Sequence, residues 1–247
     1  MYDNEFIVVI PARSGSKSIP KKNIVDLKGF PLISYSIVAG NMIEKAERTI
    51  ISTDSEEIAD IAIQYGAEAP FLRPPSISGD KDNDKTWVIH LLSELHKIEH
   101  FYPKYLIQLR PTTPLREPEI LNKAVEFFLE HESKCSGMRS AHLIAESPYK
   151  YFIKKDKYWD NFGGLKGEEV SNRPKEMFED VYKPNGYIDI IKTETVLSSF
   201  NALYGNNILA FETEEVTEID SYNEYEQIKC EIEYKENSLY LHLRNRF

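Results

Sequence analysis

Five apolar residues near the start of the chain, Phe6-Ile7-Val8-Val9-Ile10, lead directly into a polar segment, Pro11-Ala12-Arg13-Ser14-Gly15-Ser16-Lys17-Ser18-Ile19-Pro20-Lys21-Lys22-Asn23. An uninterrupted apolar run of this length is typical of a strand that is buried on both faces of a sheet. In sheets of parallel strands, ligands bind beyond the carboxyl ends of the strands. The stretch therefore predicts a central strand of an α/β fold, followed by a loop at the position where such folds bind ligands.

Strand and helix patterns alternate through the rest of the first half of the chain. The expected strands in this part span 6–10, 49–52, 69–72 and 105–109, and the expected helices span 31–43, 56–65, 84–98 and 117–131. Later in the chain, two further strands are expected over 186–191 and 208–211, and one helix over 221–234. Alternation of strands with helices of this length indicates a parallel sheet within a layered α/β fold.

The regular pattern stops after about Ser136, where aromatic residues, lysines and turn residues mix without a clear period. We therefore expect residues 141–183 to form an insertion outside the parallel sheet. Residues 1–140 and 184–247 then form one α/β domain. The sequence leaves open whether the insertion is a lid or a subunit contact.

Composition and charge narrow the classes of protein. The chain has 247 residues, 41% of them hydrophobic and 28% charged, which is typical of a globular protein with a sizeable core. Its 40 acidic and 30 basic residues give a net charge of −10, which argues against nucleic acid or a membrane surface as a partner. Its two cysteines, an acidic start and the lack of a long apolar run predict a cytoplasmic protein without disulfides, signal peptide or membrane span.

The loop after the first strand stands out against this acidic background. It carries four cations, Arg13, Lys17, Lys21 and Lys22, separated by small residues. Small residues let backbone N–H groups approach an anion, and fixed positive charges neutralise a polyphosphate. The loop has neither the Walker A order nor the G-x-G-x-x-G order. A solvated loop without chemical function is the alternative, but four cations at the carboxyl end of a strand favour a phosphate site.

The segment from Ile10 to Asn23 resembles the nucleotide-binding signature of the acylneuraminate cytidylyltransferases, the CMP-sialic acid synthetase family. The continuation Leu27-Lys28-Gly29-Phe30-Pro31-Leu32-Ile33 is similar to the turn that follows in that family. The KDO cytidylyltransferases share the opening but differ beyond it, and Asn23 favours the sialic-acid-like branch. The resemblance implies a Rossmann-like, GT-A-like α/β/α nucleotidyltransferase fold with an inserted dimerisation or lid segment.

The resemblance also assigns nucleotide-binding residues. It implies that Arg13 and Lys22 are catalytic, and that CTP is bound by Arg13, Ser16, Lys22, Asn23, Arg73 and Gln108. Gln108 begins a second similar motif, Gln108-Leu109-Arg110-Pro111-Thr112-Thr113-Pro114-Leu115-Arg116. Two residues stay open between a structural and a functional role: Asp54, which can cap the following helix, and Arg116, which can pair locally with Glu117.

Four residues resemble the part of the family that binds the sugar acid. They are Lys150, Arg173, Tyr182 and Asn185. The Tyr182-x-x-Asn185-Gly186 segment matches well, whereas Arg173 lies further from Tyr182 than the family spacing. Asp189 stands where the family usually has a tyrosine. These differences leave the identity of the acceptor open.

A pair of acidic residues near the end of the chain resembles the metal site of the family. Glu218 and Asp220 alternate in an extended segment, so their carboxylates can point the same way. Two carboxylates beside a triphosphate suit Mg²⁺. The alternative is that Asp220-Ser221 only caps the following helix.

Together these motifs imply a cytidylyltransferase that transfers CMP from CTP to the anomeric hydroxyl of a nonulosonic acid of the sialic, legionaminic or pseudaminic type. Pyrophosphate is the other product, Mg²⁺ the cofactor and a homodimer the expected assembly. The alternatives are a cytidylyltransferase for another acidic sugar or a phosphonate, a protein that binds a nucleotide without turning it over, and a metal-independent glycosyltransferase of related fold.

Overall fold

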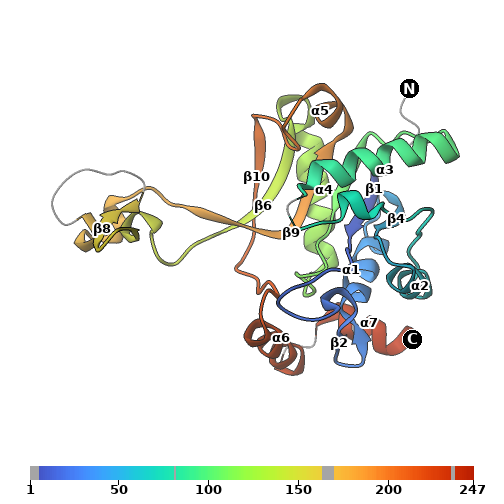
Figure 1. The fold of residues 1–247 in the computed structure, drawn as a ribbon, viewed down its shortest axis with the longest axis horizontal. Coiled ribbons are helices and arrows are strands. Elements are labelled where there is room, and N and C mark those ends of the chain that lie inside the picture. Colours follow the sequence, from blue (N-terminus) through green and yellow to red (C-terminus); the bar gives the residue numbers. More distant parts are fainter. Residues whose placement is uncertain (1–5, 81, 163–169, 235–236) are drawn as a thin grey trace.

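A six-stranded sheet forms the centre of this computed structural model, which describes residues 6–80, 82–162, 170–234 and 237–247 (Figure 1). The strands are β1 (Phe6–Pro11), β4 (Ala46–Ser52), β5 (Tyr105–Gln108), β6 (Gly137–Leu143), β9 (Tyr182–Lys192) and β10 (Ile208–Glu212), in the order β10-β6-β9-β5-β1-β4. Neighbouring strands pair in parallel, except that β9 runs antiparallel to β5 and β6. The expected parallel sheet is confirmed for the four strands β1, β4, β5 and β10; β6 is a further parallel strand that was not expected, and β9 runs antiparallel.

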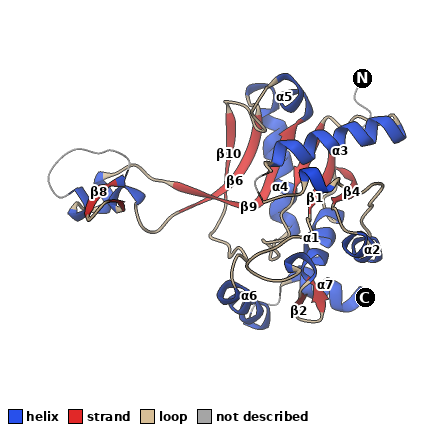
Figure 2. Cartoon of the chain, viewed as in Figure 1, coloured by secondary structure: helices blue, strands red, loops and turns tan. Residues whose placement is uncertain are grey.

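Helices cover both faces of this sheet (Figure 2). They are α1 (Leu32–Asn41), α2 (Glu56–Gln64), α3 (Asp84–Glu99), α4 (Pro118–His131), α5 (Thr193–Ser198), α6 (Tyr222–Tyr234) and α7 (Ser238–Arg246). Phe6, Val8 and Ile10 pack into a core with residues of α1, α4 and α7, while Ile7 and Val9 pack with α3 and α5 on the opposite face. Because successive side chains of β1 enter different cores, the strand has to be apolar throughout. The layered α/β/α fold is confirmed.

The ends of the helices follow local sequence signals. Ser55 caps α2 by accepting a hydrogen bond from the Ile58 N–H, and Asn83 caps α3 by accepting one from the Thr86 N–H. Gly66 follows α2 with a φ of +93°, the left-handed conformation that ends many helices. All five helices expected from the sequence are present, with ends shifted by a few residues.

The expected strand over 69–72 is wrong. Only Glu68 bridges to Ile50, and the chain then leaves the sheet. The Arg73 N–H donates to the Thr53 carbonyl oxygen at 2.6 Å, which turns the segment across the end of β4. This turn places the Arg73 side chain at the carboxyl edge of the sheet.

The described residues between β6 and β9, 144–162 and 170–181, extend away from the sheet as an arm (Figure 1). The arm begins as a ribbon in which Leu143 pairs with Tyr182. Further out it carries a hairpin of β7 (Phe152–Lys155) and β8 (Tyr158–Asn161). The residues of the arm have no regular hydrophobic period, and part of the expected insertion, 163–169, lies outside the described residues.

Short elements complete the description. A small hairpin of β2 (Asp26–Leu27) and β3 (Phe30–Pro31) precedes α1. Single 3-10 turns span Lys22–Ile24, Pro75–Ile77, Glu132–Lys134, Pro148–Lys150, Val170–Asn172 and Lys175–Met177. Within the part of the chain that the structure describes, no helix has the length and apolar character needed to cross a bilayer.

Candidate active site

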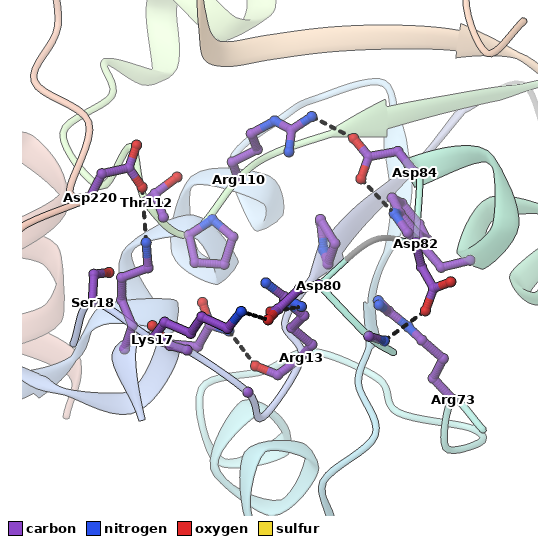
Figure 3. Close-up of a pocket in the computed structure, with 18 of the residues that line it drawn as sticks. Arg13, Lys17, Ser18, Arg73, Asp80, Asp82, Asp84, Arg110, Thr112 and Asp220 are labelled. Carbon is purple, nitrogen blue, oxygen red and sulfur yellow. Dashed lines mark hydrogen bonds and ion pairs between the residues drawn. The ribbon is translucent and has the colours of Figure 1, made fainter. Parts of the chain in front are cut away.

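A cavity of about 580 Å³ opens at the carboxyl edge of the sheet, beyond the end of β1 (Figure 3). Four residues that were expected to bind the nucleotide from the first loop line it: Arg13, Ser16, Lys22 and Asn23. Asn23 also holds the loop, since its side-chain amide donates to the Arg13 carbonyl oxygen at 2.8 Å. The loop thus presents three of its four cations, together with serine hydroxyls, to one cavity, as expected for an anion site.

Two of the loop cations share one carboxylate in the cavity. Asp80 accepts from Arg13 at 2.7 Å and from Lys17 at 2.5 Å (Figure 3). Hydrogen bonds from Lys17 and Arg13 lower the pKa of Asp80 below its ordinary value, so this carboxyl is ionised at neutral pH. Asp80 therefore occupies donors of two cations of the loop that was expected to bind phosphate. Lys21 points elsewhere, to Glu57 at 2.7 Å, and does not line the cavity.

Asp54 holds the same loop from the end of β4. Its carboxylate accepts from the backbone N–H and the hydroxyl of Ser14, both at 2.7 Å. The cap of α2 is Ser55, so the capping role considered for Asp54 is wrong. Asp54 thus holds the loop in place through Ser14 and is not among the residues that line the cavity.

The two acidic residues from the far end of the chain meet the loop. Lys22 donates to the Asp220 carboxylate and to the Ile219 carbonyl oxygen, both at 3.0 Å. Glu218 and Asp220 both line the cavity, and Glu218 accepts from the Thr112 hydroxyl at 3.0 Å. Lys22 and Asp220, which are 198 positions apart in the sequence, are therefore neighbours at one site.

Asp220 does not serve as a helix cap. The Glu224 carboxylate accepts from the backbone N–H groups of Asp220 and Ser221, at 2.8 and 2.7 Å. The Ser221 hydroxyl in turn faces the Glu224 N–H at 3.5 Å, which is the reciprocal arrangement of a capping box. The side chain of Asp220 is thereby left for the cavity.

Arg73 forms a buried part of the cavity wall. Its guanidinium donates to the Ser52 hydroxyl and carbonyl oxygens at 2.7–3.1 Å and lies 5.5 Å from the ring of Trp87. Burial lowers the pKa of Arg73, although the nearby Asp54 and Asp84 oppose this shift. These contacts fix the side chain in place, with one side turned to the cavity.

In the motif that begins at Gln108, Arg110 lines the cavity and the expected Gln108 does not. Gln108 is 1% exposed and does not line the cavity; its amide nitrogen lies 3.4 Å from Asp84, which does. Arg110 also lines the cavity and donates to Asp84 at 2.5 Å. Burial would raise the pKa of Asp84, but the charge of Arg110 and hydrogen bonds from Trp87 and Arg110 outweigh it, so the pKa is lowered.

Several residues of the wall were missed from the sequence: Lys17 as a partner of Asp80, and Asp80, Asp82, Asp84, Arg110 and Thr112. Arg110 and Thr112 lie inside the motif that begins at Gln108, so that motif was the available signal. The acidic residues of the 80–84 segment carried no recognisable pattern.

Arg116 is structural, and its suggested pairing with Glu117 is wrong. It is fully buried, at 0% exposed, and donates to the carbonyl oxygens of Tyr187, Gly186 and Arg110 and to the Ser36 hydroxyl at 2.6–3.0 Å. Burial lowers its pKa to about 9, so the guanidinium stays protonated at neutral pH. Arg116 thus ties the second motif to the start of the inner half of β9.

Replacing Arg116 with alanine is expected to lower the free energy of unfolding by about 3 kcal/mol or more, because buried carbonyl acceptors lose their donors. Urea unfolding measures the change. Arg244→Ala on the exposed side of α7 is the control, with an expected change of at most about 0.5 kcal/mol. A loss for Arg116→Ala as small as that of the control would contradict the structural role.

The residues expected to bind the sugar acid lie away from this cavity. Lys150 and Arg173 belong to the arm, and Tyr182 is the first residue of β9. Asn185 is buried, with its amide directed to Thr213 at 2.7 Å and to His142 at 3.3 Å. The described chain therefore brings the loop and the acidic pair together, but not these four residues.

The sequence of this chain matches a known protein family over most of its length. A family model described as Cytidylyltransferase matches residues 7–195. The chain belongs to the cytidylyltransferase family. It is thus a nucleotidyltransferase, and the expected enzyme class is confirmed.

Several proteins similar to this cytidylyltransferase are named for the sugar acid on which they act. A CMP-N,N'-diacetyllegionaminic acid synthase of Legionella pneumophila is 34% identical over 202 residues, covering 78% of this chain and 80% of the relative. A pseudaminic acid cytidylyltransferase of Campylobacter jejuni is 36% identical over 152 residues, covering 62% of either protein. A solved CMP:2-keto-3-deoxy-manno-octonic acid synthetase, in complex with CTP, superposes with a TM-score of 0.68 at 16% identity, over 94% of this chain and 99% of that one. At this identity the superposition shows a shared fold.

Proposed function

We propose that the enzyme transfers CMP from CTP to the anomeric hydroxyl of a nonulosonic acid of the sialic, legionaminic or pseudaminic type. The observation that carries the proposal is the meeting of the cationic loop with the acidic pair, through Lys22 and Asp220 at 3.0 Å, in one cavity. The similarity to legionaminic and pseudaminic acid enzymes supports the acceptor class. The superposition on a synthetase solved with CTP supports the fold that such chemistry uses.

In this reaction the anomeric oxygen forms a bond to the α-phosphorus, the bond from that phosphorus to the bridging oxygen breaks, and pyrophosphate leaves with the electron pair. The hydroxyl proton is released to solvent. Such transfer depends mainly on positioning and on neutralising the charge of the phosphates. Arg13 and Lys22 supply fixed positive charge, while Ser16 donates from the loop. Arg73 and Asn23 complete the wall on the nucleotide side.

Mg²⁺ is the proposed cofactor, and the residues present fit it. Glu218 and Asp220 place two carboxylates on the cavity wall, and hard oxygen donors completed by substrate phosphates are what Mg²⁺ prefers. When bound, the cation supplies neutralisation of the phosphate charge. Lys22, which contacts Asp220, has to shift its hydrogen bonds when the site fills.

Asp80 is expected to compete with the triphosphate for Arg13 and Lys17. Asp80→Asn should lower KM for CTP by about fivefold, because the exposed ion pairs of Asp80 with Arg13 and Lys17 no longer have to be broken. Steady-state kinetics at constant ionic strength measure this. Asp60→Asn, an exposed residue of α2, makes the same change of net charge as a control. An unchanged or higher KM in Asp80→Asn would contradict the competition.

We propose further that the enzyme is a homodimer in which the arm, residues 141–183, reaches the neighbouring subunit. Two observations support this: the arm exposes large apolar side chains, with Tyr158 at 68% and Trp159 at 67%, and Lys150 and Arg173 lie away from the cavity of their own chain. Exposed aromatic residues of this size are typical of subunit contacts. A cytoplasmic location belongs to the same proposal, since CTP is found there.

Mixing two inactive variants tests the dimer. Arg13→Ala damages the cavity and Arg173→Ala damages the arm, so a heterodimer keeps one site with an intact cavity and an intact arm. Co-expression in equal amounts should restore about a quarter of the wild-type activity by random pairing, and light scattering should give a dimer. A monomer, or no activity beyond the sum of the two variants, would contradict the proposal.

Pyrophosphate release tests the function itself. The purified enzyme is incubated with CTP, Mg²⁺ and single acids from a panel of sialic, legionaminic and pseudaminic acids, KDO and a phosphonate. We expect release with at least one nonulosonic acid and none without an acid. Turnover with KDO or the phosphonate alone would favour the alternative acceptor, and binding of CTP without turnover of any acid would favour a nucleotide-binding protein.

A further inference from the structure

A row of polar residues crosses the sheet behind the cavity wall. Gln108 on β5 and Arg139 on β6 both stand opposite Asp189 on β9 in the strand register. Gln108 and Asp189 are each 1% exposed. Tyr204, from the loop before β10, places its hydroxyl 2.9 Å from Asp189 and 3.2 Å from Gln108. A carboxyl group this deeply buried requires a specific explanation.

The hydrogen bonds of this row fix the orientation of Gln108. Asp84 is ionised and accepts from Arg110 and from the Trp87 ring N–H at 3.0 Å, so the group that Gln108 presents to it has to be the amide nitrogen. The Gln108 carbonyl oxygen therefore faces Tyr204. That hydroxyl has a single proton, yet it lies between two acceptors if Asp189 is ionised.

Arg139 does not resolve this conflict. Its Nε forms an ion pair with the Asp189 carboxylate at 3.5 Å but has no hydrogen-bond partner among the described residues, while its guanidinium lies 4.8 Å from the centre of the Tyr204 ring. The other groups that act on Asp189 are the Ser140 N–H, which donates to Oδ1 at 3.2 Å, and the more distant charges of Arg110 and Arg116. Burial outweighs these groups and raises the pKa of Asp189.

We propose that Asp189 is protonated at neutral pH and heads a hydrogen-bond chain, Asp189 to Tyr204 to Gln108 to Asp84, that holds Arg110 in position in the cavity. Each donor then has one acceptor: the Asp189 O–H donates to Tyr204, the Tyr204 O–H to Gln108, and the Gln108 amide to Asp84. Asp84 in turn accepts from Arg110.

The opposite side of Arg110 is confined as well. Gly186 has a φ of +61°, and a Cβ atom added there would lie 2.8 Å from the Arg110 Cδ atom. The aliphatic part of Arg110 thus passes directly over the glycine, while its guanidinium is held by Asp84. Asp189 and Tyr204 are positioning residues in this scheme, because they act on the cavity through Gln108 and Asp84. Only the kinetic consequence rests on the proposed nucleotidyl transfer.

Infrared spectroscopy tests the proton without any need for turnover. The difference spectrum between wild type and Asp189→Asn at neutral pH should contain the C=O band of a buried carboxylic acid. A raised pKa also removes stability as pH rises above the ordinary Asp value of about 4. The advantage in Tm of Asp189→Asn over wild type should therefore widen from about pH 4 to neutral pH. A carboxylate band alone, or a constant difference in Tm, would overturn the proposal.

Kinetics test the positioning. An asparagine amide N–H can replace the carboxylic O–H, so Asp189→Asn should keep kcat/KM within about twofold of wild type. Tyr204→Phe breaks the chain and should lower kcat/KM by about tenfold through loss of orientation of Arg110. Tyr225→Phe removes a hydroxyl that bonds to the Asp26 carbonyl oxygen outside the row and serves as the matched control.

The outcomes separate a positioning role from a structural one. Tyr204→Phe and Tyr225→Phe are compared at temperatures equally far below their Tm, so a loss of stability alone affects both. Wild-type kinetics in Tyr204→Phe would overturn the positioning role, and a loss in a folded Asp189→Asn equal to that in Tyr204→Phe would overturn the protonated state. If the wild type turned over no acid, the infrared result would still decide the protonation.

Discussion

Replacing Arg13 with alanine should lower kcat/KM by about a thousandfold, the scale on which preorganised donors to a developing charge act in enzymes. The guanidinium lines the cavity and donates to Asp80, so it is available to phosphate oxygens once Asp80 is displaced. The fold should survive, because the side chain is 36% exposed and the loop contact of Asn23 goes to the backbone oxygen of residue 13. Pyrophosphate release under saturating acid measures the loss.

Lys21→Gln is the matched control for this prediction. Lys21 lies in the same loop and carries the same charge as Arg13, but it is 66% exposed and bonds to Glu57 outside the cavity. We expect its kcat/KM to stay within about threefold of wild type, as for the loss of a surface ion pair. Equal losses in Arg13→Ala and Lys21→Gln would mean that the loop acts through its net charge and not through the placement of Arg13.

Asp220→Ala should reduce turnover at least a hundredfold, roughly the scale measured for a lost group that stabilises charge in an active site. The variant removes one of two carboxylates proposed to hold Mg²⁺, and it leaves Lys22 without its partner. The start of α6 should be unaffected, since Glu224 and Ser221 satisfy the backbone there. Activity is measured over a range of Mg²⁺ concentrations, and a higher Mg²⁺ requirement is expected for whatever activity remains.

Glu215→Gln is the control for the loss of an acidic residue in the same segment. Glu215 is exposed and outside the cavity, so the Mg²⁺ dependence of this variant should match wild type. Wild-type activity and Mg²⁺ dependence in Asp220→Ala would remove Asp220 from the metal site. Asp220→Asn keeps the shape without the charge, and it should resemble Asp220→Ala if charge is what matters.

The parts of the fold that depend on local pattern were predictable. Every residue of β1 has to be apolar because successive side chains, such as Val8 and Val9, enter cores on opposite faces of the sheet. The cations of the loop that follows are visible in the sequence in the same way. By contrast, β6 was missed because it mixes Met138 and Ser140 with Arg139 and His142, and only its partners on either side bury it. Unlike β1, whose six residues form a nearly uninterrupted apolar run, β6 has no apolar pattern that marks it as a strand.

The candidate site shows the same division. Arg13, Lys22 and Asp220 were identified because each lies in a segment that resembles the family, and the fold brings all three to one cavity. Asp80 and Asp84 could not be identified, because their role comes from a segment that crosses the end of the sheet and supplies counter-charges to distant arginines. Contacts of this kind depend on tertiary placement, which sequence spacing does not encode.

A crystal structure of the enzyme with CTP and Mg²⁺ tests the central claim most directly. The account predicts the triphosphate on Arg13, Ser16 and Lys22, with Asp80 displaced from the loop and the cation between the phosphates and the carboxylates of Glu218 and Asp220. A nucleotide bound elsewhere, or a cation held away from both carboxylates, would contradict it.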